Sequence, residues 1–269
     1  MHCAAQLLAY GVHVTSRRSD LSTSTRIRTV LLVAALMTEV LSAASGAQSR
    51  TLNEQADAAF TRRLPPISAA PACAIGETAT AFPGGSEQFA VLDPKYRLPK
   101  GWKPAHLAWV NKSQQLQREA AHAWRTMQMA AAHKAIRLTV VSAYRSESHQ
   151  SSVFNRNVKK SGRAHALKFV ARPGHSEHQL ALTVDVGLSA GVTLNAEPVT
   201  TPKTKSQRAA NWLAAHAFEY GWVRSYPKGG LKKTCYGSEP WHWRFIGVAE
   251  AQNYRASGLT LREYLWQKR

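Results

Sequence analysis

The chain has 269 residues, of which 44% are apolar, so it is long enough for one large domain or two small ones. Its 35 basic residues outnumber its 16 acidic residues and give a formal net charge of +19 at pH 7. A charge of this size favours an anionic partner or contributes to solubility. The basic residues are spread along the chain without a recognition helix or zinc-finger spacing, so we predict no nucleic-acid partner.

The N-terminus has the residue order of a secretory signal. Arg26 and Arg28 precede an apolar run over residues 30–41, and small residues follow up to Ala47. This order predicts a signal peptide over residues 1–47, and the run is too short to span a bilayer as a mature helix. An uncleaved anchor is the alternative. Cleavage would leave 31 basic and 14 acidic residues, a net charge of +17. We therefore expect an exported protein, periplasmic or extracellular, that faces an anionic cell envelope and has no stable membrane span.

Residues 48–86 are predicted to form a linker or a loosely packed arm. They are rich in Ala, Ser, Thr, Pro and Gly, and Pro65-Pro66 interrupts any long helix. After cleavage the chain keeps Cys73 and Cys235, an even pair that permits one disulfide in an oxidising compartment. The alternative is that Cys235 binds a metal ion, since it lies close to a histidine motif described below.

Residues 87–269 are predicted to form one domain. Apolar side chains recur at steps of three and four over residues 116–133, which predicts an amphipathic helix. Other helices are predicted over residues 148–159, 205–220, 247–256 and 260–266, and Gly221 is placed to end the second of these. Strands are predicted over residues 138–141, 182–186 and 241–246. Because helices flank the strands irregularly, we predict an α+β domain with a small, mainly antiparallel sheet.

Two short motifs hold a candidate metal centre. The first runs from Pro173 through His178 to Asp185, and the second is Glu239-Pro240-Trp241-His242. His178, Asp185 and His242 supply two imidazoles and a carboxylate, the three-ligand set that leaves zinc an open fourth position for water. Asp185 lies among apolar residues, where an unpaired carboxylate would be costly, so it needs a cation partner. A salt bridge to Lys or Arg would serve equally well.

Three further residues bear on the predicted metal centre. His175 competes with His178 as a ligand, but Pro173-Gly174 just before it favours a loop, and only a helix would put both imidazoles on one face. Glu239 is placed to take a proton from water, although it could be a surface carboxylate before a turn. Arg145 follows a predicted strand, and its guanidinium can bind a substrate carboxylate through two hydrogen bonds or stabilise an oxyanion. Its alternative is an ordinary surface arginine.

Three motifs follow one another along the chain. They are Ser142-x-Tyr144-Arg145-Ser146 followed by Gln150, then Pro173-Gly174-x-Ser176-Glu177-His178-Gln179 with Asp185, then Glu239-Pro240-Trp241-His242-Trp243-Arg244. Their order and spacing resemble the VanY-type D-alanyl-D-alanine carboxypeptidases, and the similarity covers roughly residues 89–266.

The resemblance implies a zinc peptidase of the Hedgehog/DD-peptidase fold that removes the C-terminal D-alanine of peptidoglycan stem peptides. By position, Glu239 would be the catalytic base, and Arg145 would help to hold the charged intermediate. The positions that match the family's ligands to one Zn²⁺ ion are His178, Asp185 and His242. The positions that match its substrate contacts are Arg145, Gln150 and Ser176.

Other activities stay open at this point. A dipeptidase, an L,D-carboxypeptidase or an endopeptidase would keep the same metal centre. A non-catalytic cell-wall-binding module would be expected to lack a ligand or the base, and here all four residues are present.

The chain departs from the family pattern at three positions. The family usually has glycine three residues after the first histidine and alanine two residues further on, where this chain has Ala181 and Thr183. An added methyl group at a close backbone approach could narrow the site or shift Asp185. Cys235 also stands where glycine is common in the family, so a disulfide there would not be a family feature.

Overall fold

The computed structural model describes residues 69–73, 80–81 and 86–268. By its internal contacts the chain divides into residues 1–66 and residues 67–269, and every described residue belongs to the second unit. The predicted signal peptide and most of the predicted arm lie outside the described residues. Within the described part, we find no helix with both the length and the apolar character needed to cross a bilayer.

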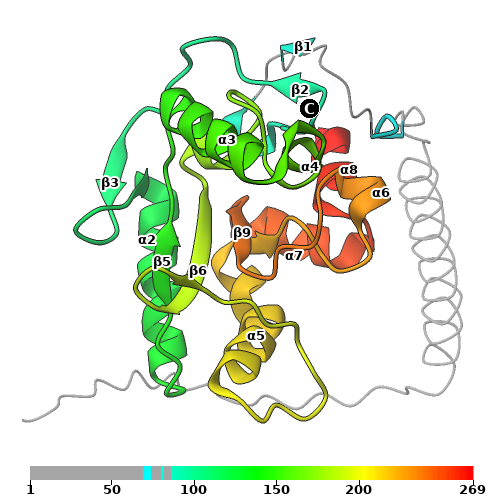
Figure 1. The fold of residues 1–269 in the computed structure, drawn as a ribbon. Helices are drawn as coiled ribbons and strands as arrows, with labels where there is room; N and C mark the ends of the chain where they lie inside the picture. The colour runs from blue at the N-terminus through cyan, green and yellow to red at the C-terminus, as the bar shows by residue number, and fades with distance from the viewer. Residues whose placement is uncertain (1–68, 74–79, 82–85, 269) are drawn as a thin grey trace, which may run out of the picture. The chain divides into compact units, whose positions relative to one another are not determined.

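An antiparallel sheet of five strands forms the centre of the domain (Figure 1). The strand order is β5-β6-β9-β8, and β7 pairs with β6. The strands are β5 (Thr139–Ser142), β6 (Thr183–Ser189), β7 (Val192–Thr193), β8 (Trp222–Arg224) and β9 (His242–Phe245). The three predicted strands are confirmed as β5, β6 and β9, with ends that differ by one to three residues. The short strands β7 and β8 are not among the predicted ones.

The register of this sheet brings distant residues together. Asp185 on β6 pairs with Ser142 on β5 and with His242 on β9. Side chains directly opposite each other in a sheet point to the same face and lie a few ångströms apart. Asp185 and His242 are therefore neighbours on one face.

Helices flank the sheet on its sides and ends (Figure 1). The longer helices are α2 (Arg118–Ala132), α3 (Glu147–Ser161), α5 (Lys205–His216), α7 (Val248–Ser257) and α8 (Leu261–Lys268). The shorter ones are α4 (Arg163–Phe169), α6 (Leu231–Thr234) and the 3-10 helices η1 (Glu87–Phe89), η2 (Glu177–Leu180) and η3 (Ala217–Tyr220). The five predicted helices are confirmed, with η3 completing the stretch up to residue 220. The helices α4 and α6 are not among the predicted ones.

Among the described residues, four short strands lie outside the central sheet. They form two small sheets, in which β1 (Thr80–Ala81) pairs with β2 (Tyr96–Arg97) and β3 (Leu107–Trp109) pairs with β4 (Gln115–Gln117). Together with the central sheet and the flanking helices, they give the predicted α+β domain.

Local sequence explains where two of the helices begin. Ser146 caps α3, and its side chain accepts a hydrogen bond from the backbone N–H of His149. Thr204 and Gln207 form a reciprocal capping box at the start of α5. Gly221, with φ +82°, ends η3 in the left-handed conformation that glycine adopts without strain.

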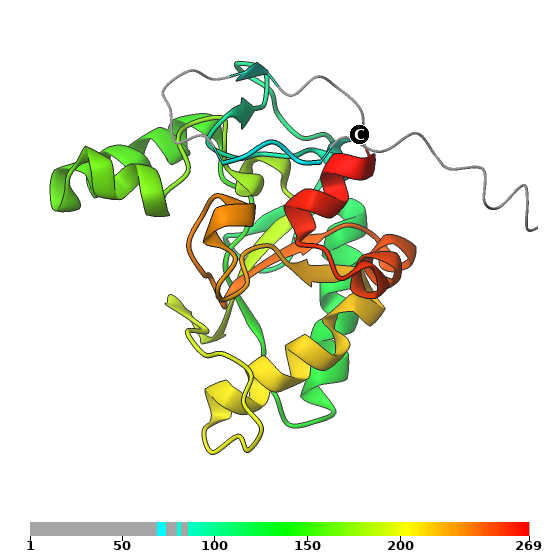
Figure 2. The same cartoon turned by 90° about the vertical axis from the view of Figure 1, so that its right-hand side faces the viewer.

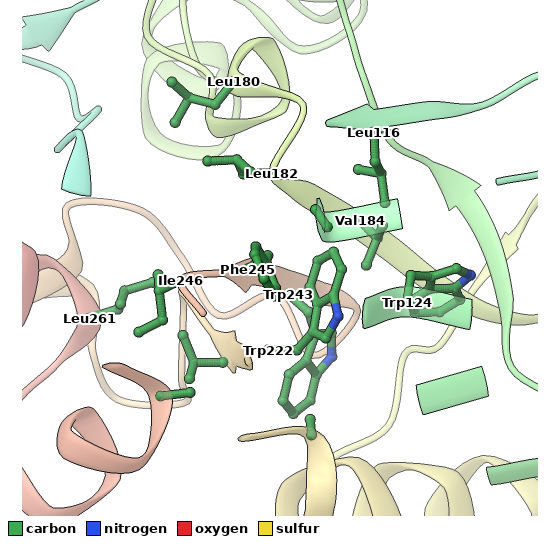
Figure 3. Close-up of a cluster of buried hydrophobic side chains, with 14 of the residues drawn as sticks. Leu116, Trp124, Leu180, Leu182, Val184, Trp222, Trp243, Phe245, Ile246 and Leu261 are labelled. Atoms are coloured by element: carbon green, nitrogen blue, oxygen red, sulfur yellow. The ribbon is translucent and has the colours of Figure 1, made fainter. Parts of the chain in front are cut away.

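The sheet separates a hydrophobic core from the polar face that carries Asp185. Side chains alternate along a strand, so Val184 and Val186 point away from Asp185 and into the core. On that side Trp124 of α2 meets Trp222 of β8 edge to face, with ring centroids 6.0 Å apart, and both rings are fully buried (Figure 3). Such pairs add about 0.5–1.5 kcal/mol to the free energy of burial. The core therefore holds the sheet rigidly behind the polar face.

A disulfide attaches part of the predicted arm to the domain. Cys73 is bonded to Cys235, which follows α6. The bond excludes Cys235 as a metal ligand. Cys235 has φ +70°, in the left-handed region. That backbone conformation explains physically why glycine would be favoured at this position.

Ala181 occupies a second left-handed position. It ends η2 with φ +56° and is fully buried, so this chain carries a methyl group where glycine would be unstrained. Thr183, two residues on, is also fully buried, and its hydroxyl has no hydrogen-bond partner. Asp185 nevertheless lies beside both candidate histidines, so neither departure displaces it.

We expect Ala181→Gly to raise the free energy of unfolding by about 1 kcal/mol, because alanine is strained at positive φ and glycine is not. Chemical denaturation of the two proteins measures the change. Ala120→Gly is the matched control, since Ala120 is equally buried but helical, and there the same substitution should destabilise by about 1 kcal/mol. A lower free energy of unfolding for Ala181→Gly would contradict the prediction.

Candidate metal centre

One cavity of about 160 Å³ contains every site residue predicted from the sequence. These residues are Arg145, Gln150, Ser176, His178, Asp185, Glu239 and His242. They come from the end of β5, from α3, from the segment around η2, from β6 and from the turn into β9. The fold thus assembles the three motifs into one site.

His178 is buried and oriented through one ring nitrogen. Its Nδ1 lies 2.7 Å from the carbonyl oxygen of Ala143, which can only accept, so Nδ1 carries the proton. Its Nε2 is then a free acceptor and lies 3.3 Å from Oδ2 of Asp185. Burial lowers the pKa of His178, and the nearby charge of Asp185 offsets this only partly. A neutral imidazole with one nitrogen held and the other open is the form that binds metal ions.

His242 is surrounded by three carboxylates. Its Nδ1 lies 3.4 Å from Asp185 Oδ1 and 3.2 Å from Glu239 Oε2, and its Nε2 lies 3.0 Å from Glu177 Oε2. Burial would lower the pKa of His242, but hydrogen bonds to Asp185, Glu177 and Glu239 outweigh it and hold this pKa well above its ordinary value. Three carboxylates in a buried site repel one another, and a bound cation would stabilise them.

Asp185 joins the two imidazoles. Burial would raise the pKa of Asp185, but the charges of His178 and His242 and their hydrogen bonds hold it well below its usual range. Oδ1 of this carboxylate is buried and receives no hydrogen bond of normal geometry. The ligand atoms of the three residues lie within 4.8 Å of one another. Two nitrogens and one carboxylate oxygen at this spacing fit a zinc ion with an open fourth position.

Arg145 lies near Oδ2 of Asp185, whereas His242 lies near Oδ1. One of its amino groups donates to Gln150 Oε1 at 2.8 Å, and the other donates to Ser142 Oγ at 3.0 Å and lies 3.8 Å from Asp185 Oδ2. Gln150 is itself held, because its amide nitrogen donates to the carbonyl of Ala171 at 2.6 Å. The salt bridge considered as an alternative for Asp185 is therefore long, and the firmer contacts of Arg145 fix its guanidinium at the cavity wall.

Glu239 reaches the cavity through a tight turn. The backbone N–H of His242 donates to the carbonyl of Glu239 at 3.2 Å, so the two side chains leave the turn side by side. The side chain of Glu239 is 24% exposed, against 5% for His242, and lies at the solvent side of the cluster. Ser176 also lines the cavity and is buried. The arrangement places a further carboxylate beside the three candidate ligands.

His175 has a structural role. Its Nδ1 lies 2.8 Å from the carbonyl oxygen of Asp93 and 3.1 Å from that of Tyr96, and the ring is buried outside the cavity. The preference for His178 over His175 therefore agrees with the geometry.

Two residues that contact His242 were not among the site residues predicted from the sequence. Glu177 faces its Nε2, and Tyr226 packs its ring against the imidazole with centroids 4.8 Å apart. Burial would raise the pKa of Glu177, but Arg244 and hydrogen bonds from His242 and Ser225 lower it to about 2. Both residues lie within residues 89–266, which resemble the family. For Glu177 the sequence did offer a signal, because it is a carboxylate directly before a candidate ligand in an otherwise buried motif.

A buried cluster of three candidate ligands, open toward a cavity and flanked by a further carboxylate, is the arrangement of a metal-dependent hydrolase. The sequence model of the family VanY, D-alanyl-D-alanine carboxypeptidase, matches residues 113–248, about half of the chain. The chain belongs to this family.

Named relatives agree with this assignment. The Bacillus subtilis protein YodJ is 35% identical over 65% of this chain and 66% of its own length. The bifunctional D-Ala-D-Ala dipeptidase and D-Ala-D-Ala carboxypeptidase VanXYC of Enterococcus gallinarum is 33% identical over 65% of this chain and 91% of its own. By contrast, the match covers only 46% of a D-alanyl-D-alanine carboxypeptidase of Enterococcus faecalis.

Solved structures share the fold. The LdcB LD-carboxypeptidase has a TM-score of 0.56 and 31% identity, over 66% of this chain and 85% of its own. A vancomycin-resistance D,D-pentapeptidase VanY in complex with Zn(II) has a TM-score of 0.57 and 23% identity, over 67% and 99% of the two chains. These neighbours confirm the predicted Hedgehog/DD-peptidase-like α+β fold.

Proposed function

We propose that this protein is an exported, zinc-dependent D-alanyl-D-alanine carboxypeptidase that hydrolyses the terminal D-alanine of peptidoglycan stem peptides. The observation that carries the proposal is the single cavity that joins His178, Asp185 and His242 to Glu239 and Arg145. Family membership and the D-Ala-D-Ala activities named for the relative VanXYC support the substrate class.

Each residue then has a defined task. His178, Asp185 and His242 would hold the zinc ion, which supplies a Lewis acid that polarises the scissile carbonyl and makes water more acidic. Glu239 accepts a proton from the attacking water and passes it to the leaving amine. Arg145, held in place by Gln150 and Ser142, offers its guanidinium to the substrate carboxylate or to the developing negative charge. The burial of the ligands strengthens these interactions by excluding water.

Contacts to the substrate's terminal region are proposed for Arg145, Gln150 and Ser176. All three line the cavity. Gln150 already engages Arg145 and Ala171 through both ends of its amide. We therefore assign Gln150 chiefly to the positioning of Arg145, while Ser176, which lines the same cavity, is the more direct contact.

An L,D-carboxypeptidase is the second candidate. LdcB, an LD-carboxypeptidase, is 31% identical to this chain, more than the 23% of the VanY structure. The same metal centre would serve both reactions, since they differ in the configuration of the residue before the scissile bond.

Product analysis on defined stem peptides distinguishes the two candidates. Pentapeptide and tetrapeptide stems are incubated with the full chain, with and without a chelator, and the products are identified by mass spectrometry. We expect chelator-sensitive release of one D-alanine from the pentapeptide. Release from the tetrapeptide alone would favour the L,D activity, and no release from either stem would overturn both.

Export and domain organisation are part of the proposal. Residues 1–47 would be the signal peptide, residues 48–86 a linker or arm, and residues 87–269 the catalytic domain. The disulfide between Cys73 and Cys235 supports export, because such bonds persist mainly in oxidising compartments. N-terminal sequencing of the mature protein tests the cleavage, which we expect to expose Gln48.

A basic face on α3 and α4 supports association with an anionic cell envelope. The chain has no acidic residue between positions 148 and 172. The exposed basic residues of this face are Arg156, Lys159, Lys160, Arg163 and Lys168. The two helices, drawn in green, lie at one side of the domain in Figure 2, and Phe169 at the end of α4 lines the cavity. The face therefore adjoins the site.

We expect the double variant Lys159→Glu/Lys160→Glu to bind purified cell wall several-fold more weakly at low salt. The loss should fade as salt is added, because screening weakens interactions between exposed charges. Pull-down with insoluble wall at several ionic strengths measures it. Lys203→Glu/Lys205→Glu makes the same charge change near the start of α5 and should bind nearly as the wild type does. Equal losses in the two variants would contradict a role for this face.

A further inference from the structure

Glu177 contacts His242 from outside the cavity. It is only 6% exposed and is not among the side chains that line the cavity. Its Oε2 accepts a hydrogen bond from Ser225 Oγ at 2.6 Å and lies 3.0 Å from His242 Nε2. Its Oε1 lies 3.1 Å from Nη1 of Arg244. A buried carboxylate with three partners has little freedom to move.

Arg244 anchors this carboxylate from behind. Its side chain is fully buried, and Nη2 donates to the carbonyl oxygens of Glu87 at 3.1 Å, Gln88 at 3.2 Å and Ala90 at 3.4 Å. The guanidinium thus links the segment around η1 to Glu177. The carboxylate of Glu177 in turn contacts His242. The position of the imidazole depends on contacts made outside the cavity.

We propose that Glu177 is a positioning residue for the metal centre. It accepts the Nε2 proton of His242, and this leaves Nδ1 as the open nitrogen on the side of Asp185 and Glu239. His178 is set in the opposite way, because the carbonyl of Ala143 holds its Nδ1 and leaves Nε2 open. Each candidate histidine therefore has a dedicated partner that selects which nitrogen faces the metal. The inference rests on the proposed zinc centre.

A second buried ion pair offers a matched control. Asp93 is 1% exposed and Arg262 is 8% exposed, and their side chains approach to 2.7 Å. Neither lines the cavity, and the carboxylate of Asp93 is held by the backbone N–H groups of Lys95 and Tyr96 and by Arg262. Loss of either buried carboxylate should weaken the fold, since it leaves a buried guanidinium without its partner. Only loss of Glu177 should change the affinity for zinc.

The experiment compares Glu177→Gln, Glu177→Asp and Asp93→Asn with the wild type in the full chain. Zinc dissociation constants are measured by competition with a chromophoric chelator, and thermal unfolding is followed on the metal-free proteins. We expect Glu177→Gln and Glu177→Asp to raise the zinc dissociation constant by about 10–100-fold, the usual effect of disturbing the partner of a metal-binding histidine. The amide oxygen of glutamine is a neutral and weaker acceptor for the Nε2 proton, and the shorter carboxylate of aspartate is drawn back from it. Asp93→Asn should lower the unfolding temperature while leaving the dissociation constant within about twofold of the wild type.

Two results would overturn the inference. Glu177→Gln that folds and binds zinc within about twofold of the wild type would show that Glu177 serves only the fold. If Glu177→Gln does not fold, Glu177→Asp decides by the same criterion, since it keeps the charge beside Arg244 but draws it back from His242. A wild-type chain that binds no zinc would overturn the proposed metal centre and this inference with it. Unchanged zinc affinity in the variants would overturn this inference alone.

Discussion

Replacement of Glu239 by glutamine should lower the turnover number for D-alanine release by about 10²–10⁴-fold, the usual contribution of a general base. Glutamine keeps the shape of the side chain but cannot accept a proton. The three candidate ligands remain, so the zinc content should not change. Steady-state kinetics on a pentapeptide stem, together with metal analysis of the same sample, measures both quantities.

The control for this variant is Glu219→Gln. Glu219 is a half-exposed carboxylate on η3 that pairs with His216, outside the cavity, so its loss should leave turnover within about twofold of the wild type. Full activity of Glu239→Gln would disprove the assigned base. Loss of zinc from Glu239→Gln would instead show that Glu239 binds the metal.

Replacement of Asp185 by alanine should weaken zinc binding strongly and abolish D-alanine release. The carboxylate lies between the two imidazoles, 3.3 Å from His178 Nε2 and 3.4 Å from His242 Nδ1. Without it the site offers two nitrogens and no negative charge among its ligands. The zinc dissociation constant should rise by more than the roughly 10–100-fold that follows loss of an outer partner. Chelator competition and the pentapeptide assay measure the two effects.

Thr183→Ala is the matched control for Asp185→Ala. Thr183 lies two residues earlier on β6 and is fully buried, so both substitutions remove a polar group from the same strand. Its hydroxyl has no partner, and zinc affinity should stay near that of the wild type. Retention of zinc by Asp185→Ala would support the alternative in which Asp185 serves mainly as a partner of Arg145.

Long periodic elements could be predicted from the residues alone. The apolar stripe of α2 and the glycine that ends the stretch of α5 and η3 are local signals, because helix periodicity and helix termination depend on neighbours a few residues away. Very short elements could not. The strand β8 spans three residues, too few for an alternation pattern, and it is held by its pairing with β9. The short helix α4, seven residues long, had no predicted counterpart either.

The candidate ligands and base could be named in advance because each motif is compact. Glu239 and His242 share one turn, and Ser176 and His178 lie within one short segment. Residue type and short spacing suffice for such groups, since a zinc site of this class needs few and distinctive side chains.

The contacts between elements could not be predicted from the sequence. The sheet register sets Asp185 beside His242, and the long-range contacts of Glu177 with His242 and Arg244 orient the ring. The disulfide between Cys73 and Cys235 likewise excluded a ligand that spacing had left open. Residue identity thus determined the chemistry available to this protein. Strand pairing and burial, which depend on residues far apart in the sequence, decided which atoms face the metal position and which hold them there.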